Sequence, residues 1–252
     1  MKTLPLDILL YIIDILAARH HEGIGTLRKL SQTCKYMVPL CRKHLFSSLR
    51  LWGQSNSVRF SNLLSKNPDI AHYVRTLNYK VFSLPRSNHE RNILDMLKKR
   101  SSLQSIELSS SINLSWNNLT ESIRSSMLSL IQLPTVTSLS IYLIEGFPAT
   151  ALSGCGNLVN LQLGGLNLAP PEVNQIISPS KIPAPLSLYI DSGTYGLAAL
   201  LNSASLHAGG PIVDFGRLRK AEFRVGSRDD IDQVNEMVRV TTRLEHFCIS
   251  GE

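Results

Sequence analysis

The chain has 252 residues, of which 43% are hydrophobic and 18% charged, and its formal net charge is +7. This composition excludes disorder along the whole chain, because the apolar surface is large enough to offset the entropy of ordering. No stretch reaches the roughly 18 uncharged apolar residues that span a membrane. The four cysteines (34, 41, 155 and 248) are too scattered for a disulfide framework. We therefore expect a protein of the cytoplasm, the nucleus or both, without a membrane partner.

Positive charge is concentrated near the N-terminus. Residues 1–50 carry eight basic and three acidic side chains, a net of +5, which leaves +2 for the remaining 202 residues. Two electrostatic regions suggest two functional regions, although such a cluster is also typical of a solvated helical face.

The first 50 residues predict three short helices. Pro5 suits the first turn of a helix whose apolar residues recur at helical spacing. This helix is expected to stop before Gly23, and Thr26 is expected to cap a second helix. A third helix would cover residues 40–49. These helices have more apolar surface than about 45 residues can bury alone, so something else must cover the surplus.

Two segments carry a family resemblance: Leu4-Pro5-x-Asp7-Ile8-Leu9-x-x-Ile12-Ile13-x-x-Leu16 and Leu27-x-x-Leu30-Ser31-Gln32-Thr33-Cys34-Lys35. They resemble the F-box, which has a Leu-Pro opening, an acidic residue two places later, a Leu/Ile helix and a second helix of this pattern. The continuation over residues 37–46 is similar to the fungal version. The resemblance implies a three-helix unit over residues 1–50 that docks on a small acidic adaptor subunit, which connects to a cullin and a RING-type ubiquitin ligase.

The docking face that the resemblance implies consists of apolar residues of the first two helices. They are Leu4, Pro5, Ile8, Leu9, Ile12, Leu16, Leu27 and Leu30. The alternative for each of them is burial in an intramolecular core.

Residues 51–72 are expected to form a linker or capping helix, and a recurring frame fills residues 73–252. The frame apolar-x-x-apolar-x-apolar begins at residues 74, 103, 136, 158, 185, 218 and 244. Its intervals of 22 to 33 residues are typical of leucine-rich repeats, in which each unit is a short strand with a returning helix or loop. The repeats are degenerate, because the usual asparagine is mostly absent. The predicted fold is therefore mixed α/β: an F-box-like helical unit followed by a degenerate leucine-rich-repeat solenoid with a parallel sheet.

The segments between the frames predict helices and one loop. Residues 91–99, 121–133, 197–206 and 229–240 read as helices, and residues 169–185 as a proline-rich loop. The last of these helices has a capping-box start at Ser227 and Asp230, with Ile231, Val234 and Val238 expected inward. No closing helix or polar cap follows the seventh frame, so we expect an exposed edge or a longer array, with fraying over residues 244–249.

The middle residue of each apolar-x-apolar triplet points away from the core. Side by side, these residues would form a mixed-polarity ridge for target proteins, on the concave face that solenoids use for binding. The alternative is that each is merely a solvated strand residue. The ridge residues are Asn78, Glu107, Ser140, Gln162, Tyr189 and Glu222, with Cys248 at the seventh position.

No motif for catalysis or metal binding is found. Cys34-x6-Cys41-x2-His44 lacks the spacing and the fourth ligand of a zinc site, so burial of both thiols is the better interpretation. Acid, base and nucleophile do not occur together, and we expect no enzyme activity and no cofactor.

The sequence therefore favours a substrate-recognition adaptor of a ubiquitin ligase, with an adaptor subunit and an unknown target protein as partners. The first alternative is a leucine-rich-repeat scaffold outside the ubiquitin system, in which the N-terminal helices only cap the repeats. The second is a basic nucleic-acid binder, which is disfavoured because the basic residues do not interleave with aromatics.

Overall fold

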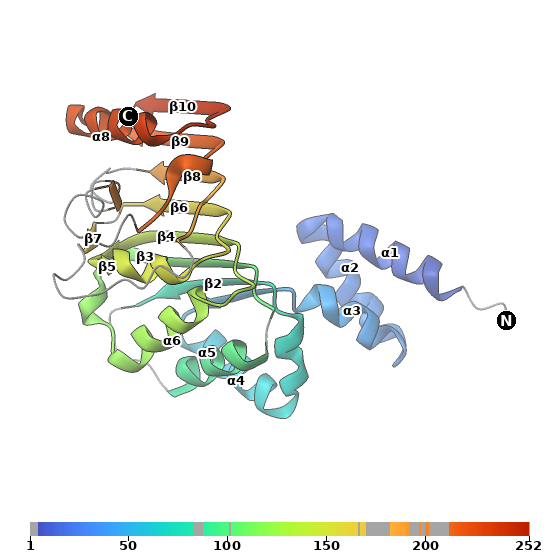
Figure 1. Cartoon of the computed structure of the whole chain (residues 1–252). Helices are drawn as coiled ribbons and strands as arrows, with labels where there is room; N and C mark the ends of the chain where they lie inside the picture. Colours follow the sequence, from blue (N-terminus) through green and yellow to red (C-terminus); the bar gives the residue numbers. More distant parts are fainter. Residues whose placement is uncertain are drawn as a thin grey trace.

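The computed structural model describes residues 5–82, 88–100, 102–165, 167–169, 182–191, 197, 200–201 and 212–251, except for the side chains of His20 and His21. It has two parts, a unit of three helices and a parallel β-sheet with helices along one side (Figure 1). No described helix combines the length and the apolar character needed to cross a bilayer.

The helical unit consists of α1 (Leu6–Ala18), α2 (His20–Thr33) and α3 (Met37–Leu45). It has a small core of its own, made by Ile13, Leu27, Met37 and Cys41, which is separate from the core beneath the sheet. At the surface, Asp14 of α1 lies 3.0 Å from Lys43 Nζ and 2.9 Å from His44 Nε2 of α3. The hydrogen bond from Lys43 lowers the pKa of the Asp14 carboxyl, so the two helices are also linked by charge.

The second helix begins earlier than the glycines suggest. We expected the chain to break at Gly23 and to restart at Thr26, but both residues lie inside α2, and the Thr26 hydroxyl donates to the carbonyl oxygen of Glu22. Gly23 is buried where α2 crosses the end of α1, and a Cβ there would lie 1.6 Å from the carbonyl oxygen of Leu16. Glycine is therefore required for close approach of two backbones rather than for a turn.

Two further expectations for this unit were wrong. Cys34 is exposed, because it follows the last turn of α2 in an extended conformation. Leu49 belongs to a strand and not to the third helix, which ends at Leu45.

Eight parallel strands form the main sheet, and their order in space is their order in the sequence. They are β1 (Ser48–Trp52), β2 (Thr76–Val81), β3 (Ser105–Ser115), β4 (Ser138–Glu145), β6 (Asn160–Gly164), β8 (Ser187–Asp191), β9 (Lys220–Val225) and β10 (His246–Gly251). The short strands β5 (Phe147–Pro148) and β7 (Leu168–Ala169) form a second parallel pair. The mixed α/β class and the parallel sheet are confirmed.

Each of the seven predicted frames contains a strand that begins two residues after the first apolar residue of the frame, as β2 begins at Thr76 in the frame of Val74. The spacing works because the second and third apolar residues alternate into the core while the residue between them faces outward. Strand β1 was missed, although Phe46-x-x-Leu49-x-Leu51 matches the frame.

Helices cover one face of the sheet, and α4, α5 and α6 lie side by side in Figure 1. The α-helices here are α4 (Gln54–Lys66), α5 (Asn88–Arg100), α6 (Glu121–Ile131) and α8 (Arg228–Val240). The 3-10 helices are η1 (Pro68–Tyr73), η2 (Trp116–Asn118), η3 (Ala149–Gly154) and η4 (Phe215–Arg217). The expected helix over 197–206 and loop over 169–185 lie largely outside the described residues.

Helix α8 is rotated relative to the sequence prediction. The capping box is present, and Asp230 Oδ2 accepts the backbone N–H groups of Gly226 and Ser227. This holds Asp230 against the sheet, so that Val234 and Met237, four and seven residues later, are buried. Ile231 and Val238, which we expected to point inward, are therefore exposed on one flank.

The close contact at Gly23 leads to a prediction. Gly23→Ala should lower the free energy of unfolding by about 1–3 kcal/mol, because one of the two helices must move. Gly25→Ala is the control: it places a methyl group in open space on the same helix and should raise the stability by up to about 1 kcal/mol. Chemical denaturation followed by circular dichroism measures both changes, and equal effects of the two variants would contradict the packing described.

Candidate functional site

Helix α1 presents an apolar stripe to solvent. Ile8, Tyr11, Ile12 and Ile15 have exposed fractions of 44%, 68%, 39% and 41%. Their spacing of three and four residues places them on one face of the helix. This α1 stripe lies on the opposite side of the helix from Ile13, which is fully buried in the helical core. A contiguous exposed apolar face is typical of a surface that another polypeptide covers.

The predicted docking residues occupy different environments. Pro5, Ile8 and Ile12 are exposed, whereas Leu9, Leu16 and Leu30 are half-buried against the helical core. Leu27 is fully buried in that core, because it faces α1 from the inner side of α2, so its side chain is not on the surface. Leu4 lies outside the described residues.

Tyr11 and Ile15 were missed by the sequence reasoning, which followed the residues of the family motif. The signal was present in the spacing, because these two residues lie three and seven positions after Ile8, on the same face.

The second candidate surface is the polar face of the sheet. The strand register places the six predicted ridge residues directly opposite one another in one continuous row across β2, β3, β4, β6, β8 and β9. Arg50 of β1 and Cys248 of β10 extend the row at its two ends. The six residues predicted for the ridge therefore lie side by side in one row across the sheet.

Tyr142 lies at the centre of this face. Its hydroxyl donates to Gln162 Oε1 at 2.7 Å, and Ser140 donates to the same oxygen at 3.2 Å. A Cβ on Gly164 would lie 2.5 Å from Cδ1 of Tyr142, so glycine on β6 leaves the room that the ring occupies. Burial raises the pKa of Tyr142, and the nearby Tyr189 and Glu107 raise it further. Tyr142 is two residues beyond Ser140 on the same face, and the sequence reasoning missed it because it considered one outward position per strand.

The ends of the polar face are held by charged and aromatic contacts. On β9, Lys220 Nζ lies 2.8 Å from Glu222, and its hydrogen bond lowers the pKa of that carboxyl. At the β1 end, Trp52 Nε1 donates to Asn78 Oδ1 at 3.0 Å, and the Arg50 guanidinium lies 5.5 Å from the centre of the Trp52 ring. These contacts already restrict the rotamers of the side chains involved. Less side-chain entropy would therefore be lost if this face bound another molecule.

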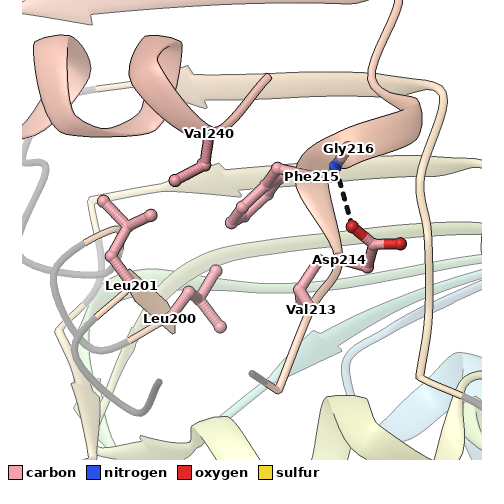
Figure 2. Close-up of a pocket in the computed structure, with 7 residues that line it drawn as sticks. All are labelled: Leu200, Leu201, Val213, Asp214, Phe215, Gly216 and Val240. Carbon is pink, nitrogen blue, oxygen red and sulfur yellow. Dashed lines mark hydrogen bonds between the residues drawn. The ribbon is translucent and has the colours of Figure 1, made fainter. Parts of the chain in front are cut away.

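A small pocket lies between η4 and the end of α8 (Figure 2). It encloses about 180 Å³, less than the 300 Å³ or more that is usual for ligand sites. Leu200, Leu201, Phe215 and Val240 point toward one another across it, and its one carboxylate, that of Asp214, accepts the Gly216 backbone N–H at 2.8 Å. The pocket is therefore an apolar hollow whose carboxylate serves the turn.

The described part of the chain holds no group of three or more His, Cys, Asp or Glu side chains placed to bind a metal ion. Its two buried thiols are also poorly suited to chemistry. Burial raises the pKa of the Cys155 thiol to about 12 and raises that of Cys41, and a thiol without its thiolate form is a weak nucleophile.

Comparison with known proteins assigns this chain to no family. A scan against protein-family models finds no match, and neither does a search of the curated proteins. The α1 stripe and the polar face of the sheet are therefore the features from which function is inferred.

The hydrogen bond at the centre of the polar face can be tested. Tyr142→Phe removes the donor to Gln162 and should lower the free energy of unfolding by about 0.5–1.5 kcal/mol. Tyr189→Phe is the matched control, because Tyr189 lies on the same face and forms no such bond within the described residues. Urea denaturation measures both variants, and a loss as large for Tyr189→Phe would refute the assigned role of Tyr142.

Proposed function

We propose that this chain is an F-box-type adaptor that selects proteins for ubiquitin transfer. The observation that carries the proposal is the α1 stripe, since an exposed apolar face lies on the helix whose sequence resembles the F-box opening. In this proposal the stripe docks on the small acidic adaptor subunit of a cullin-RING ligase. Catalysis belongs to other subunits, and the chain contributes proximity.

The charge of the helical unit fits this partner. Arg19, Arg28, Lys29 and Lys35 are all exposed on or beside α2. Exposed positive charge on the helical unit speeds its encounter with an acidic partner, whereas the affinity comes from the buried apolar contacts.

The repeating strands supply the second half of the proposal. Eight parallel strands in sequence order, with the core-facing apolar residues of β1 to β9 buried, support a degenerate leucine-rich-repeat solenoid. The ridge and Tyr142 would then be the surface that binds the target protein. Ordered tyrosines with polar neighbours suit this role, because they offer a large contact area at a low entropic cost.

The scaffold alternative predicts that the helical unit serves only as a cap for the first repeat. A cap would merge its apolar residues with those of the repeats, whereas the core of the helical unit is separate from the core beneath the sheet. This separation favours the docking role.

Co-expression with the acidic adaptor subunit tests the proposal. The wild-type chain should co-purify with the adaptor, and the double variant Ile8→Asp/Ile12→Asp should bind with a dissociation constant at least about 30-fold higher, as expected when hot-spot contacts are lost. Both side chains are exposed, so the fold should survive, which circular dichroism checks.

The matched control is Ile112→Asp, which places the same charge at an exposed isoleucine of β3, 62% exposed and outside the α1 stripe. This variant should bind like the wild type. Failure of the wild-type chain to bind the adaptor, or equal binding by the double variant, would remove the proposal and leave the scaffold alternative.

A further inference from the structure

The centre of the polar face is negative, although the chain as a whole has a net charge of +7. Strands β3, β4, β6 and β8 lie in the middle of the sheet (Figure 1). Level with the ridge and on the two rows beside it, their outward side chains include the carboxylates of Glu107 and Asp191 and no basic group. On this face the basic residues lie on the flanking strands, such as Lys80 on β2 and Arg224 on β9.

Glu107 is the carboxylate of this centre that lacks a partner. Asp191 lies 3.0 Å from Arg224, and Glu222, toward the β9 end of the ridge, lies 2.8 Å from Lys220. Glu107, in contrast, is half-buried and forms no ion pair or side-chain hydrogen bond with any residue that the structure describes. Because a half-buried carboxylate has lost part of its hydration, it gains more from a cationic partner than an exposed one does.

Tyrosine rings lie beside this carboxylate. The Tyr142 hydroxyl donates to Gln162 at 2.7 Å, which fixes the position of the ring. Burial raises the pKa of Tyr142, and Tyr189 and Glu107 raise it further because both lie near its hydroxyl. An aromatic ring next to a carboxylate is a combination that binds cations, since the face of the ring attracts them and the carboxylate pairs with them.

The backbone beside Tyr142 is irregular. The pairing of β3 with β4 is regular up to Ser109 and Tyr142, and residues 110–113 of β3 then lie opposite Leu143 alone. Leu143 has a φ of 56°, in the left-handed region that leucine rarely adopts. Bulges and strained residues are concentrated beside binding and active sites. This irregularity is therefore a second, independent indication that Glu107 and Tyr142 belong to a binding site.

We propose that Glu107 and Tyr142 bind an arginine side chain of the target protein. The guanidinium pairs with the Glu107 carboxylate, and the Tyr142 ring packs against it. The same face already contains a contact of this kind, because the Arg50 guanidinium lies 5.5 Å from the centre of the Trp52 ring. Arginine fits better than lysine, because a planar guanidinium can stack on a ring while it forms two hydrogen bonds with one carboxylate.

Other ligands fit this centre less well. The phosphates of a nucleic acid would be repelled by the carboxylates of Glu107 and Asp191. A metal ion needs more ligands than Glu107 supplies, and the described residues contain no group of three that could hold one. A polypeptide brings its own backbone donors and acceptors beside the cation, and Gln162 and Tyr189 on the next strands offer hydrogen-bonding groups to them.

This inference rests on the proposed function, in which the ridge and Tyr142 bind the target protein. The two are nevertheless measured separately, because adaptor binding depends on α1 and arginine binding on β3 and β4. Adaptor binding without arginine recognition would remove this inference alone. Arginine recognition without adaptor binding would remove the ubiquitin role and leave a scaffold that binds arginine-containing segments.

Selection from a phage-displayed library of random dodecapeptides, with the full chain as bait, tests the inference. The selected peptides should share one arginine, and a synthetic copy should bind at least about tenfold more weakly when citrulline, a neutral analogue, replaces it. Glu107→Gln should weaken binding of the arginine peptide by a similar factor. In that variant citrulline should add less than about a twofold loss, because the two groups act as a pair. Fluorescence anisotropy measures the four dissociation constants.

The matched control is Glu222→Gln, which makes the same change in the same row at a carboxylate that is already paired with Lys220. It should bind the arginine peptide like the wild type, and circular dichroism checks that both variants fold. Selected peptides without a shared arginine, equal binding of the citrulline peptide, or independent effects of citrulline and Glu107→Gln would overturn the proposal.

Discussion

Burial between neighbouring strands is the constraint on which this structure depends. From β1 to β9, each strand covers its core-facing side chains with the next strand and with the helices on one side, and none can bury them alone. The helical unit stands apart from this succession: it has its own small core and leaves the α1 stripe exposed. The proposed function follows from this uncovered surface.

The strands could be predicted because their pattern is local. Successive side chains of a strand point to opposite faces, so the frame alone shows which of its residues enter the core. This assignment does not depend on neighbouring elements. Strand β1 was missed because Leu49 also fits a helical spacing after Leu45. What makes this segment a strand is its pairing with β2, which is distant in the sequence. The face of α8 that packs against the sheet could not be predicted from hydrophobicity. The buried Asp230 of the capping box determines this face, and Ile231 and Val238 are exposed as a result.

The candidate surfaces were predictable to different degrees. The ridge follows from strand period and register, and its six residues form one row, but the position of Tyr142 depends on the space beside Gly164 on the adjacent strand. On α1 nearly every face is apolar, so the sequence could not decide which leucines and isoleucines enter the helical core. That choice depends on the close crossing at Gly23, which brings α2 against one side of α1 and leaves the other side open.

Hydrogen exchange of the wild-type chain, alone and with the acidic adaptor subunit, tests the central claim most directly, since it reports which helix a separate polypeptide covers. The account predicts slower exchange across Leu6–Ala18 of α1 when the adaptor is present, and unchanged exchange in the strands β2 to β9. Unchanged exchange in α1, or slower exchange confined to the strands, would contradict the claim that this helix is the docking surface.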